Sequence, residues 1–382
     1  MTTSARLRAT MVERFGVDGI LGEHAWRDAA LAVPRELFVD SYFSAVPESM
    51  PTAYRTVRRG EPGWLEGIYA DRTLITQLDG TTAPGAGVDD DGKVTGSPTS
   101  SSTLPSLVLD MWRQLGVQPG HHVLEIGTGT GYSTALGAHR LGDAAVTSIE
   151  FDPVVAERAA AAFKAAGYAP RLFVGDGLHG DPHGGSYDRL IATCSVRHLP
   201  IPWLFQVKPG GRILVTLCGW SYASGLALLT VTEPGRATGR FLPGCTSFMI
   251  ARSHERPARS GLTLLSGEPR ASRINPSIIG TWTGSWVAQL AAPSAERMGG
   301  GDEQTLVDVA TGSYARTAPD PDGGWTVRQR GPLRLWDQVE RGVEAWQAVG
   351  EPHQEGFGIT VSEIGQRVWI GAEDGPGWDL PI

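Results

Sequence analysis

A strand-like run that breaks into a glycine loop constrains this chain more than any other feature of its sequence. Residues 123–132 read VLEIGTGTGY, with glycines at positions 127, 129 and 131. A short apolar run followed by glycines and a helix-forming stretch predicts a buried parallel strand, a tight turn and a helix N-terminus. Glycines let a ligand approach the backbone, and the first N–H groups of a helix are free to bind it. The G-x-G-x-G spacing favours S-adenosylmethionine (SAM) over a dinucleotide; the alternative reading is an ordinary tight turn.

Polar residues follow the next apolar runs of the chain. The run 144–149 ends in Glu150, about 20 residues past the loop, where a doubly wound sheet places the carboxylate that binds ribose hydroxyls. The run 171–174 leads to Asp176, which is suited to an adenine amino group, and the run 187–192 ends in Thr193. Strands alternating with helices predict a doubly wound α/β fold with its ligand at the carboxyl edge of a parallel sheet.

These motifs and their flanks resemble the class I SAM-dependent methyltransferases, and specifically the protein-L-isoaspartate O-methyltransferase family. The flanking motifs are VPRELFV at 33–39, YADRTLI at 69–75 and SSSTLP at 100–105, in the family's order. Thr103 stands where the family has the serine of Ser-Gln-Pro or Ser-Ala-Pro. The resemblance covers roughly residues 25 to 250. It implies a Rossmann-like methyltransferase sheet with SAM as the cofactor.

The resemblance also implies roles for single residues. Thr103 is expected to orient the attacking carboxylate as the catalytic residue, with help from Ser101 and Ser102. An alternative stays open, because Ser102 or Thr103 could cap the helix that begins near Pro105. We expect no metal site, since Gly180 and Pro182 oppose a helix that would align His179 with His183. The implied cofactor-binding residues are Ser100, Ser101, Ser102, Thr103, Glu125, Gly127, Thr128, Gly129, Gly131, Tyr132, Glu150, Phe151, Asp176, Gly177, Leu178 and Thr193.

The chain departs from the family's compact single domain by extra sequence at 40–67, at 79–96 and after 252. It thereby resembles family variants encoded with ribosomally synthesised, modified peptides such as lanthipeptides and graspetides. Those variants methylate an aspartate of the modified precursor peptide, and the ester then forms an aspartimide that persists or hydrolyses to isoaspartate. We expect this activity here. The alternatives are a repair enzyme for L-isoaspartyl sites in aged proteins and a SAM-binding regulatory protein without catalysis.

Three regions are expected along the chain. Residues 1–80 should form a mainly helical cap, residues 81–252 the methyltransferase core with a late strand at 245–250, and residues 253–382 an α+β extension. The extension holds seven of the 12 tryptophans, so it should fold. It predicts a helix at 333–346 and a hairpin of strands 357–361 and 366–370. Either a structural appendage or a peptide-recognition module fits it.

Charge and hydropathy exclude several classes of function. With a net charge of -8 and three lysines, the chain lacks the basic surface expected for binding nucleic acid. It has no run of 18 apolar residues and no signal-peptide segment, so we expect a cytoplasmic protein without a membrane span. Nothing in the sequence indicates an oligomeric state.

Overall fold

The computed structural model describes residues 2–22, 24–85, 87–257 and 267–382. The chain divides into two compact units, Met1–Thr193 and Cys194–Ile382. This division differs from the expected regions 1–80, 81–252 and 253–382. The cap at 1–80 packs with the glycine-loop half of the core, and the rest of the core pairs with the extension, as described below.

A parallel sheet forms the centre of the first unit. Strand β10 (Tyr187–Val196) pairs with β7 (Val123–Ile126), β7 with β8 (Val146–Glu150), and β8 with β9 (Arg171–Val174). Helix α5 (Tyr132–Leu141) connects β7 to β8, and α6 (Pro153–Ala166) connects β8 to β9. The last three residues of β10 begin the second unit. The predicted doubly wound α/β methyltransferase fold is confirmed.

Local signals explain where α6 begins and ends. The Asp152 side chain accepts hydrogen bonds from the first free backbone N–H groups, those of Val154 and Val155, and Pro153 occupies the first turn, where a missing N–H costs nothing. Gly167 ends the helix in a left-handed conformation (φ 81°), which glycine adopts without strain. The buried face of α6 contains Phe163.

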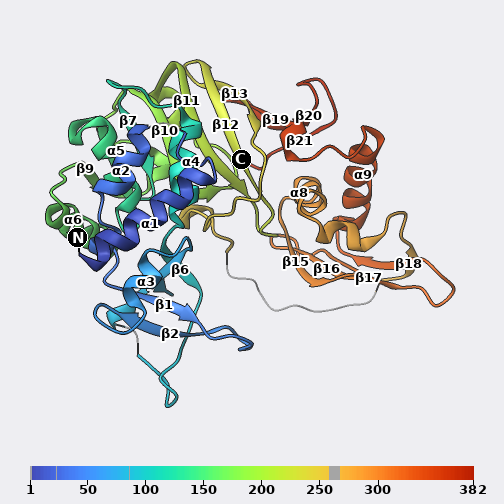
Figure 1. Ribbon diagram of the computed structural model, residues 1–382. Coiled ribbons are helices and arrows are strands. Elements are labelled where there is room, and N and C mark those ends of the chain that lie inside the picture. Colours follow the sequence, from blue (N-terminus) through green and yellow to red (C-terminus); the bar gives the residue numbers. More distant parts are fainter. Residues whose placement is uncertain (1, 23, 86, 258–266) are drawn as a thin grey trace. The chain divides into compact units, whose positions relative to one another are not determined.

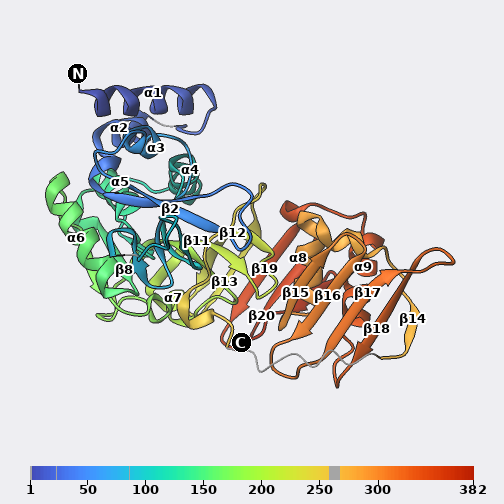
Figure 2. The same ribbon diagram turned by 90° about the horizontal axis from the view of Figure 1, so that it is seen from below.

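Helices of the amino-terminal region pack on α5. Figure 2 shows α1 (Thr3–Val17) and α2 (His24–Ala32) stacked over α5, with α4 (Pro105–Leu115) beside it. The rings of Trp26 and Trp112 are fully buried with centroids 5.6 Å apart, and Trp112 Nε1 donates to Ser133 Oγ at 3.0 Å. A Cβ at Gly137 would lie 2.6 Å from the Trp112 ring. The absence of a side chain there lets α4 approach α5 closely.

An antiparallel sheet accompanies these helices in the cap. Its order is β4-β3-β1-β2-β5, and β6 also pairs with β3. The extra sequence at 40–67 contains β1 and β2, and the extra sequence at 79–96 contains β4 and β5, so both stretches supply strands of this sheet. Strand β6 ends in the serine run. The bounds are β1 (Ser41–Ala45), β2 (Ala53–Arg58), α3 (Trp64–Ile68), β3 (Leu74–Leu78), β4 (Thr81–Thr82), β5 (Val94–Thr95) and β6 (Pro98–Ser102), with the short turns η1 (Arg35–Leu37), η2 (Ala83–Gly85), η3 (Asp143–Ala145) and η4 (Gly177–His179).

The second unit contains an antiparallel sheet whose strands come from both ends of its sequence. β11 pairs with β12, β12 with β13, β13 with β19, β19 with β20 and β20 with β21. The predicted hairpin of 357–361 and 366–370 is confirmed as β19 and β20, and it continues the sheet of the preceding core segment. The bounds are α7 (Ile201–Gln206), β11 (Val207–Cys218), β12 (Ser224–Glu233), β13 (Arg236–Phe241), β19 (Phe357–Ser362), β20 (Gly365–Ile370) and β21 (Gly377–Asp379), with the turns η5 (Arg252–His254) and η7 (Gln354–Gly356).

The strand predicted at 245–250 is wrong. Only Ile250 makes a bridge, a parallel one to Ser195. Two carbonyl groups of the segment accept from side chains instead of from a strand: Thr246 O accepts from Ser224 Oγ, and Phe248 O from Ser195 Oγ, both at 2.9 Å. Side-chain hydroxyls therefore satisfy these two carbonyls, while Met249 O accepts from the backbone N–H of Ser195 in β10 at 2.8 Å.

A second sheet of this unit is covered by two helices. Its order is β14-β18-β17-β16-β15, and Figure 1 shows α8 and α9 together against it. The predicted helix at 333–346 is confirmed as α9, with Trp336, Val339, Val343 and Trp346 buried. The bounds are β14 (Pro269–Ala271), η6 (Pro276–Gly280), α8 (Trp282–Ala291), β15 (Ala295–Gly300), β16 (Glu303–Asp308), β17 (Tyr314–Pro319), β18 (Trp325–Arg330) and α9 (Leu335–Ala348).

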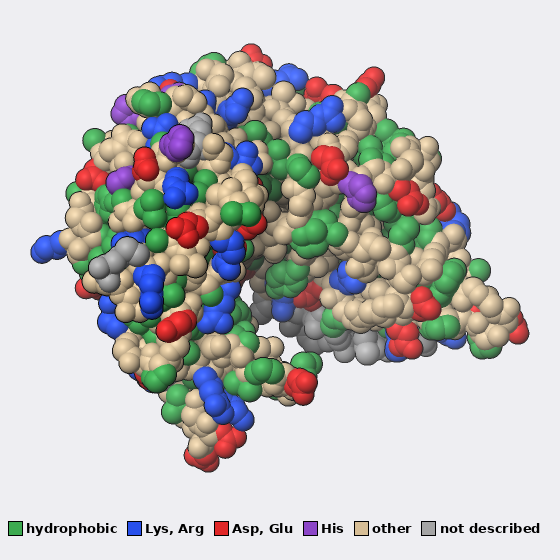
Figure 3. Space-filling view, in the orientation of Figure 1, with side chains coloured by type: hydrophobic (Ala, Val, Ile, Leu, Met, Phe, Trp, Pro, Cys, Tyr) green, Lys and Arg blue, Asp and Glu red, His purple; other side chains and the backbone are tan. Residues whose placement is uncertain are grey.

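The surface carries both signs of charge. On the face drawn in Figure 3, acidic and basic side chains are interspersed. Within the described ranges, no helix is both long enough and apolar enough to cross a bilayer.

Candidate functional site

The glycine loop between β7 and α5 has a backbone that only glycine adopts easily. Gly127, Gly129 and Gly131 have φ values of 92°, 54° and 89°, all in the left-handed region. The N–H of Gly127 donates to Ile149 O at 2.9 Å, which ties the loop to β8. A Cβ at Gly131 would lie 2.8 Å from the Phe163 ring. The loop is therefore a tight turn whose backbone stays uncovered by side chains of its own.

Glu125 lies under this loop. It is fully buried, and its carboxylate accepts from Ser133 Oγ at 2.6 Å, from Ser148 Oγ at 3.0 Å and from the Thr134 hydroxyl. Burial raises the pKa of Glu125. The carboxylate joins β7, α5 and β8 beneath the loop, so it supports the site from below. A direct contact between Glu125 and the cofactor stays a prediction.

Two more of the predicted side chains also point into the protein. Thr128 is buried, and its hydroxyl lies 2.7 Å from Ser148 Oγ. Tyr132 is buried against the cap, with its ring 6.1 Å from that of Phe38 and beneath the Arg35 guanidinium. Because both side chains are buried, Thr128 and Tyr132 would contribute to cofactor binding through their backbone groups.

The residues predicted from separate strand ends meet at this loop. Glu150 Oε2 accepts from Gly129 N at 2.7 Å, and Oε1 accepts from Asp152 N at 3.0 Å. Burial raises the pKa of Glu150, and these backbone donors oppose the rise. Thr193 Oγ1 donates to Ile126 O at 3.2 Å and to Gly127 O. The ends of β7, β8 and β10 thus converge on one set of backbone and carboxylate groups.

The end of β9 reaches the same place. Asp176 accepts from Leu178 N at 2.9 Å and caps η4. A Cβ at Gly177 would lie 2.5 Å from Ile126 Cγ2, so glycine allows this turn to pack on β7. Phe151 follows Glu150 and is 48% exposed, which leaves its ring available to a ligand.

The serine run approaches the loop from β6. A Cβ on Gly129 would lie 3.2 Å from the carbonyl oxygen of Ser101. Ser100 Oγ accepts from Thr76 Oγ1 at a long 3.4 Å, and Ser102 is buried. The Thr103 hydroxyl has no hydrogen-bond partner within the part of the chain that the structure describes. It is therefore free to donate to an acceptor group.

The capping role considered for Ser102 and Thr103 is wrong. The N-cap of α4 is Leu104, and no side chain caps the helix at that position. Asp71 Oδ1 instead accepts from Ser106 N at 3.0 Å, and Thr73 Oγ1 accepts from Leu104 N at 3.3 Å. The motif at 69–75 performs the capping from outside the helix, which leaves Thr103 for another role.

Sequence reasoning assigned no role to Arg35, although it lies in the motif at 33–39. The side chain is fully buried, and its guanidinium donates to the backbone carbonyls of Ile68 (2.6 Å), Arg72 (3.2 Å), Ser102 (3.1 Å) and Thr103 (3.1 Å). Burial lowers its pKa to about 10. Arg35 thereby ties the capping motif to the segment that carries Thr103. An arginine within the largely apolar motif 33–39 was the signal that could have identified it.

These features fit SAM. The loop presents backbone without side chains, Glu150 has carboxylate oxygens at a strand end, and Phe151 offers a partly exposed ring. Asp176 lies at the next strand end, as expected for an adenine contact. Contacts of the predicted residues with SAM remain predictions.

Comparisons with known proteins agree with this site. The family model described as protein-L-isoaspartate(D-aspartate) O-methyltransferase matches residues 89–227. The protein-L-isoaspartate O-methyltransferase of Hyperthermus butylicus is 34% identical over 248 residues, which are 62% of this chain and 86% of the relative. Protein-L-isoaspartate O-methyltransferase 2 of Syntrophobacter fumaroxidans is 38% identical over 141 residues, or 36% of this chain and 56% of the relative.

One solved structure resembles nearly the whole chain. It is the structure of a protein-L-isoaspartate O-methyltransferase, and it aligns with a TM-score of 0.56 at 18% identity, covering 96% of this chain and 100% of that chain. At this identity the likeness concerns the fold alone. Because the coverage is nearly complete, most of the second unit has a counterpart there.

Proposed function

This chain belongs to the protein-L-isoaspartate O-methyltransferase family of SAM-dependent carboxyl methyltransferases, and from that premise we propose that it esterifies the free carboxylate of an isoaspartyl residue in a polypeptide. The observation that carries the proposal is the Thr103 hydroxyl, which has no hydrogen-bond partner among the described residues and lies on a segment held by Arg35, next to the glycine loop. The names of the relatives support isoaspartate as the acceptor.

The reaction requires positioning more than proton transfer. A carboxylic acid with a pKa near 4 is ionised at neutral pH, so the acceptor oxygen needs no general base. SAM, when bound, supplies an electrophilic methyl group on a sulfonium sulfur. Thr103 can donate a hydrogen bond to one carboxylate oxygen and leave the other directed at the methyl group. The glycine loop, Glu150 and Asp176 would hold the cofactor, and Arg35 would keep Thr103 in place.

A second candidate acceptor is a normal aspartate in a cyclised, ribosomally synthesised peptide, followed by aspartimide formation. The ordered insertions β2 and β5 favour it, because they depart from the compact family pattern. Two observations place it second. The second unit has a counterpart in a solved family structure. Four of the seven tryptophans of the extension, Trp286, Trp336, Trp346 and Trp369, are buried core residues, and Trp282 is the one classed as exposed.

The test compares kcat/KM for three peptides. They are a linear isoaspartyl peptide, the same peptide with normal aspartate, and a cyclised peptide that carries a normal aspartate. We expect methyl esters mainly on the isoaspartyl peptide, with the Thr103→Val protein as a control of impaired turnover. Preference for the cyclised aspartyl peptide would reverse the order of the two candidates. SAM binding without methylation of any peptide would instead support the non-catalytic regulatory alternative.

A further inference from the structure

A cavity of about 580 Å³ lies in the first unit beside the glycine loop. One wall is the α6 face with Val155, Ala161, Ala162 and Ala165, and the opposite wall is the segment 37–41. Among the residues predicted to bind the cofactor, only Gly129 lines it, so it is a separate space that shares one wall with the cofactor site. Its size is in the range of ligand-binding pockets, about 300–1,000 Å³.

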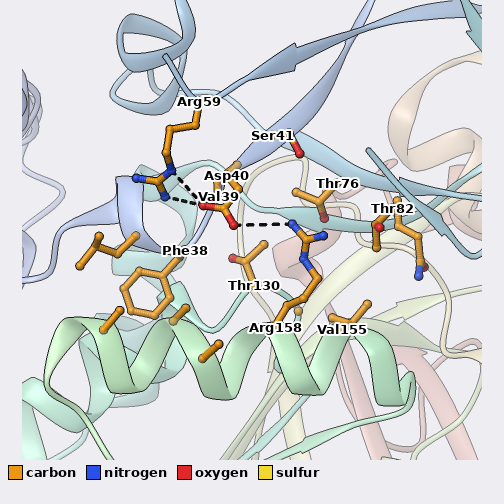
Figure 4. A pocket seen from close by; sticks show the side chains of 16 residues that line it. Phe38, Val39, Asp40, Ser41, Arg59, Thr76, Thr82, Thr130, Val155 and Arg158 are labelled. Carbon is orange, nitrogen blue, oxygen red and sulfur yellow. Dashed lines mark hydrogen bonds and ion pairs between the residues drawn. The ribbon is translucent and has the colours of Figure 1, made fainter. Parts of the chain in front are cut away.

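Two arginines share a single carboxylate at this cavity. Figure 4 shows Arg59 and Arg158 approaching Asp40 from opposite sides. Arg59 Nε donates to Asp40 Oδ1 at 3.0 Å, and its guanidinium also stacks on the Trp64 ring at 4.9 Å. Arg158 lies 4.0 Å from the other oxygen, Oδ2, a distance that leaves its N–H groups for another acceptor. In a chain of net charge -8, this group carries a net positive charge and favours an anion.

A buried hydroxyl faces the same cavity. Ser41 is 3% exposed, and within the described part of the chain its Oγ has no hydrogen-bond partner. Figure 4 places this oxygen on the cavity side. A buried hydroxyl without a partner is unfavourable, so an acceptor atom of a ligand would complete it. The arginines, this hydroxyl and the alanine face of α6 together suit a carboxylate with an apolar neighbour.

We propose that this cavity binds an acidic side chain of the polypeptide substrate, together with an apolar residue beside it. This proposal rests on the proposed function, because the acidic side chain is part of the same polypeptide substrate that accepts the methyl group. Gly129 and Thr130 line the cavity and form the glycine loop. A polypeptide anchored there by one side chain would therefore remain close to the loop. The cavity adds affinity for substrates with acidic residues and takes no part in the chemical step.

The first test measures methylation of isoaspartyl peptides in pairs. Each pair differs by one glutamate or glutamine, placed at successive positions on either side of the isoaspartyl residue. At the position that reaches the cavity, glutamate should lower KM about fivefold, the size of a partly exposed charge pair, without changing kcat. Arg158→Gln and Ser41→Ala should remove that preference. Asp40→Asn should strengthen it, because the competing carboxylate is gone.

Arg113→Gln is the matched control. Arg113 lies on another helix, pairs with Asp110 and has 37% side-chain exposure, against 39% for Arg158. It should keep the full preference for glutamate. Equal KM values for all glutamate and glutamine pairs, or the same loss in the Arg158 and Arg113 variants, would overturn the proposal.

A second measurement separates the cavity from the proposed function. Acetyl-Leu-Glu-Leu-amide and its glutamine analogue contain no methyl acceptor of the isoaspartyl kind, and calorimetry can follow their binding directly. Tighter binding of the glutamate peptide that disappears in Arg158→Gln supports the cavity even if no isoaspartyl peptide is methylated. No binding by the wild-type protein at millimolar peptide, or equal binding of both peptides, refutes the cavity even if methylation is efficient.

Discussion

Replacing Arg35 by methionine should destabilise the first unit and slow catalysis together. The substitution keeps an unbranched apolar stem and removes the guanidinium. Four carbonyls, those of Ile68, Arg72, Ser102 and Thr103, lose their donor. The buried ones, of Ile68 and Ser102, cost about 1–3 kcal/mol each when orphaned, and the part-buried ones, of Arg72 and Thr103, cost about 1 kcal/mol each. The change also relieves the burial of a charge. Burial lowers the pKa of Arg35 to about 10, which means that keeping its charge inside the protein costs about 3 kcal/mol.

The difference predicts a net loss of about 1–5 kcal/mol in the free energy of unfolding. Urea denaturation can measure it, with Arg6→Met as the exposed control. Arg35→Lys should recover only part of the loss, because one ammonium group cannot reach carbonyls in two segments. Turnover should fall while KM for SAM changes less, since the tether acts on Thr103. A loss of less than about 1 kcal/mol in the free energy of unfolding, or an unchanged kcat in the folded variant, would refute the role of Arg35 in holding the Thr103 segment.

Four further predictions concern the loop and its surroundings. Gly129→Val should abolish SAM binding in calorimetry, because a side chain there meets Ser101 O and strains a left-handed residue; undiminished affinity contradicts it. Glu150→Ala should weaken SAM binding by about 1–3 kcal/mol in the same assay. Thr103→Val should lower kcat roughly ten- to a thousandfold and Thr103→Ser should retain it; a fully active valine variant would exclude the hydroxyl. Because burial raises the pKa of Glu125, the folded state binds its proton more tightly. Wild-type stability relative to Glu125→Gln should therefore rise as pH falls from neutrality towards about 4.5, and a constant difference in urea would contradict this.

Features with a local cause could be predicted from the sequence. The parallel strands, α6 and the hairpin β19–β20 follow apolar runs, caps and turns that lie within a few residues of each other. The alternating glycines predicted a tight turn between strand and helix, and the structure has one, with positive φ at each of the three glycines. Residues at the carboxyl ends of parallel strands must meet, so Gly129, Glu150 and Thr193 could be grouped from their places in the sequence alone.

Features that depend on distant partners could not be predicted. The helix α4 is capped by Asp71, more than thirty residues earlier, and local reasoning considered only the adjacent hydroxyls. The apolar segment 245–250 looks like a strand, yet its carbonyls accept from Ser195 and Ser224. The sequence alone suggests that Arg35 is a surface charge. In the structure its guanidinium is buried and donates to backbone carbonyls of residues that are distant in the sequence. Whether the carboxyl-terminal extension recognises a peptide stays a prediction, because the burial pattern of its described residues explains a core and specifies no ligand.

The pairing of β13 with β19 has a consequence for how the protein is made. The two strands are separated by the 115 residues from Leu242 to Gly356. At a synthesis rate of about 5–20 residues per second, β13 emerges roughly 6 to 23 seconds before its neighbour. During that time it is an unpaired sheet edge, open to strands of other nascent chains. Arg236 and Arg240 lie on this strand, and charged side chains on an exposed edge discourage such pairing. We therefore expect Arg236 and Arg240 to protect the edge of β13 from pairing with other chains until β19 has been synthesised.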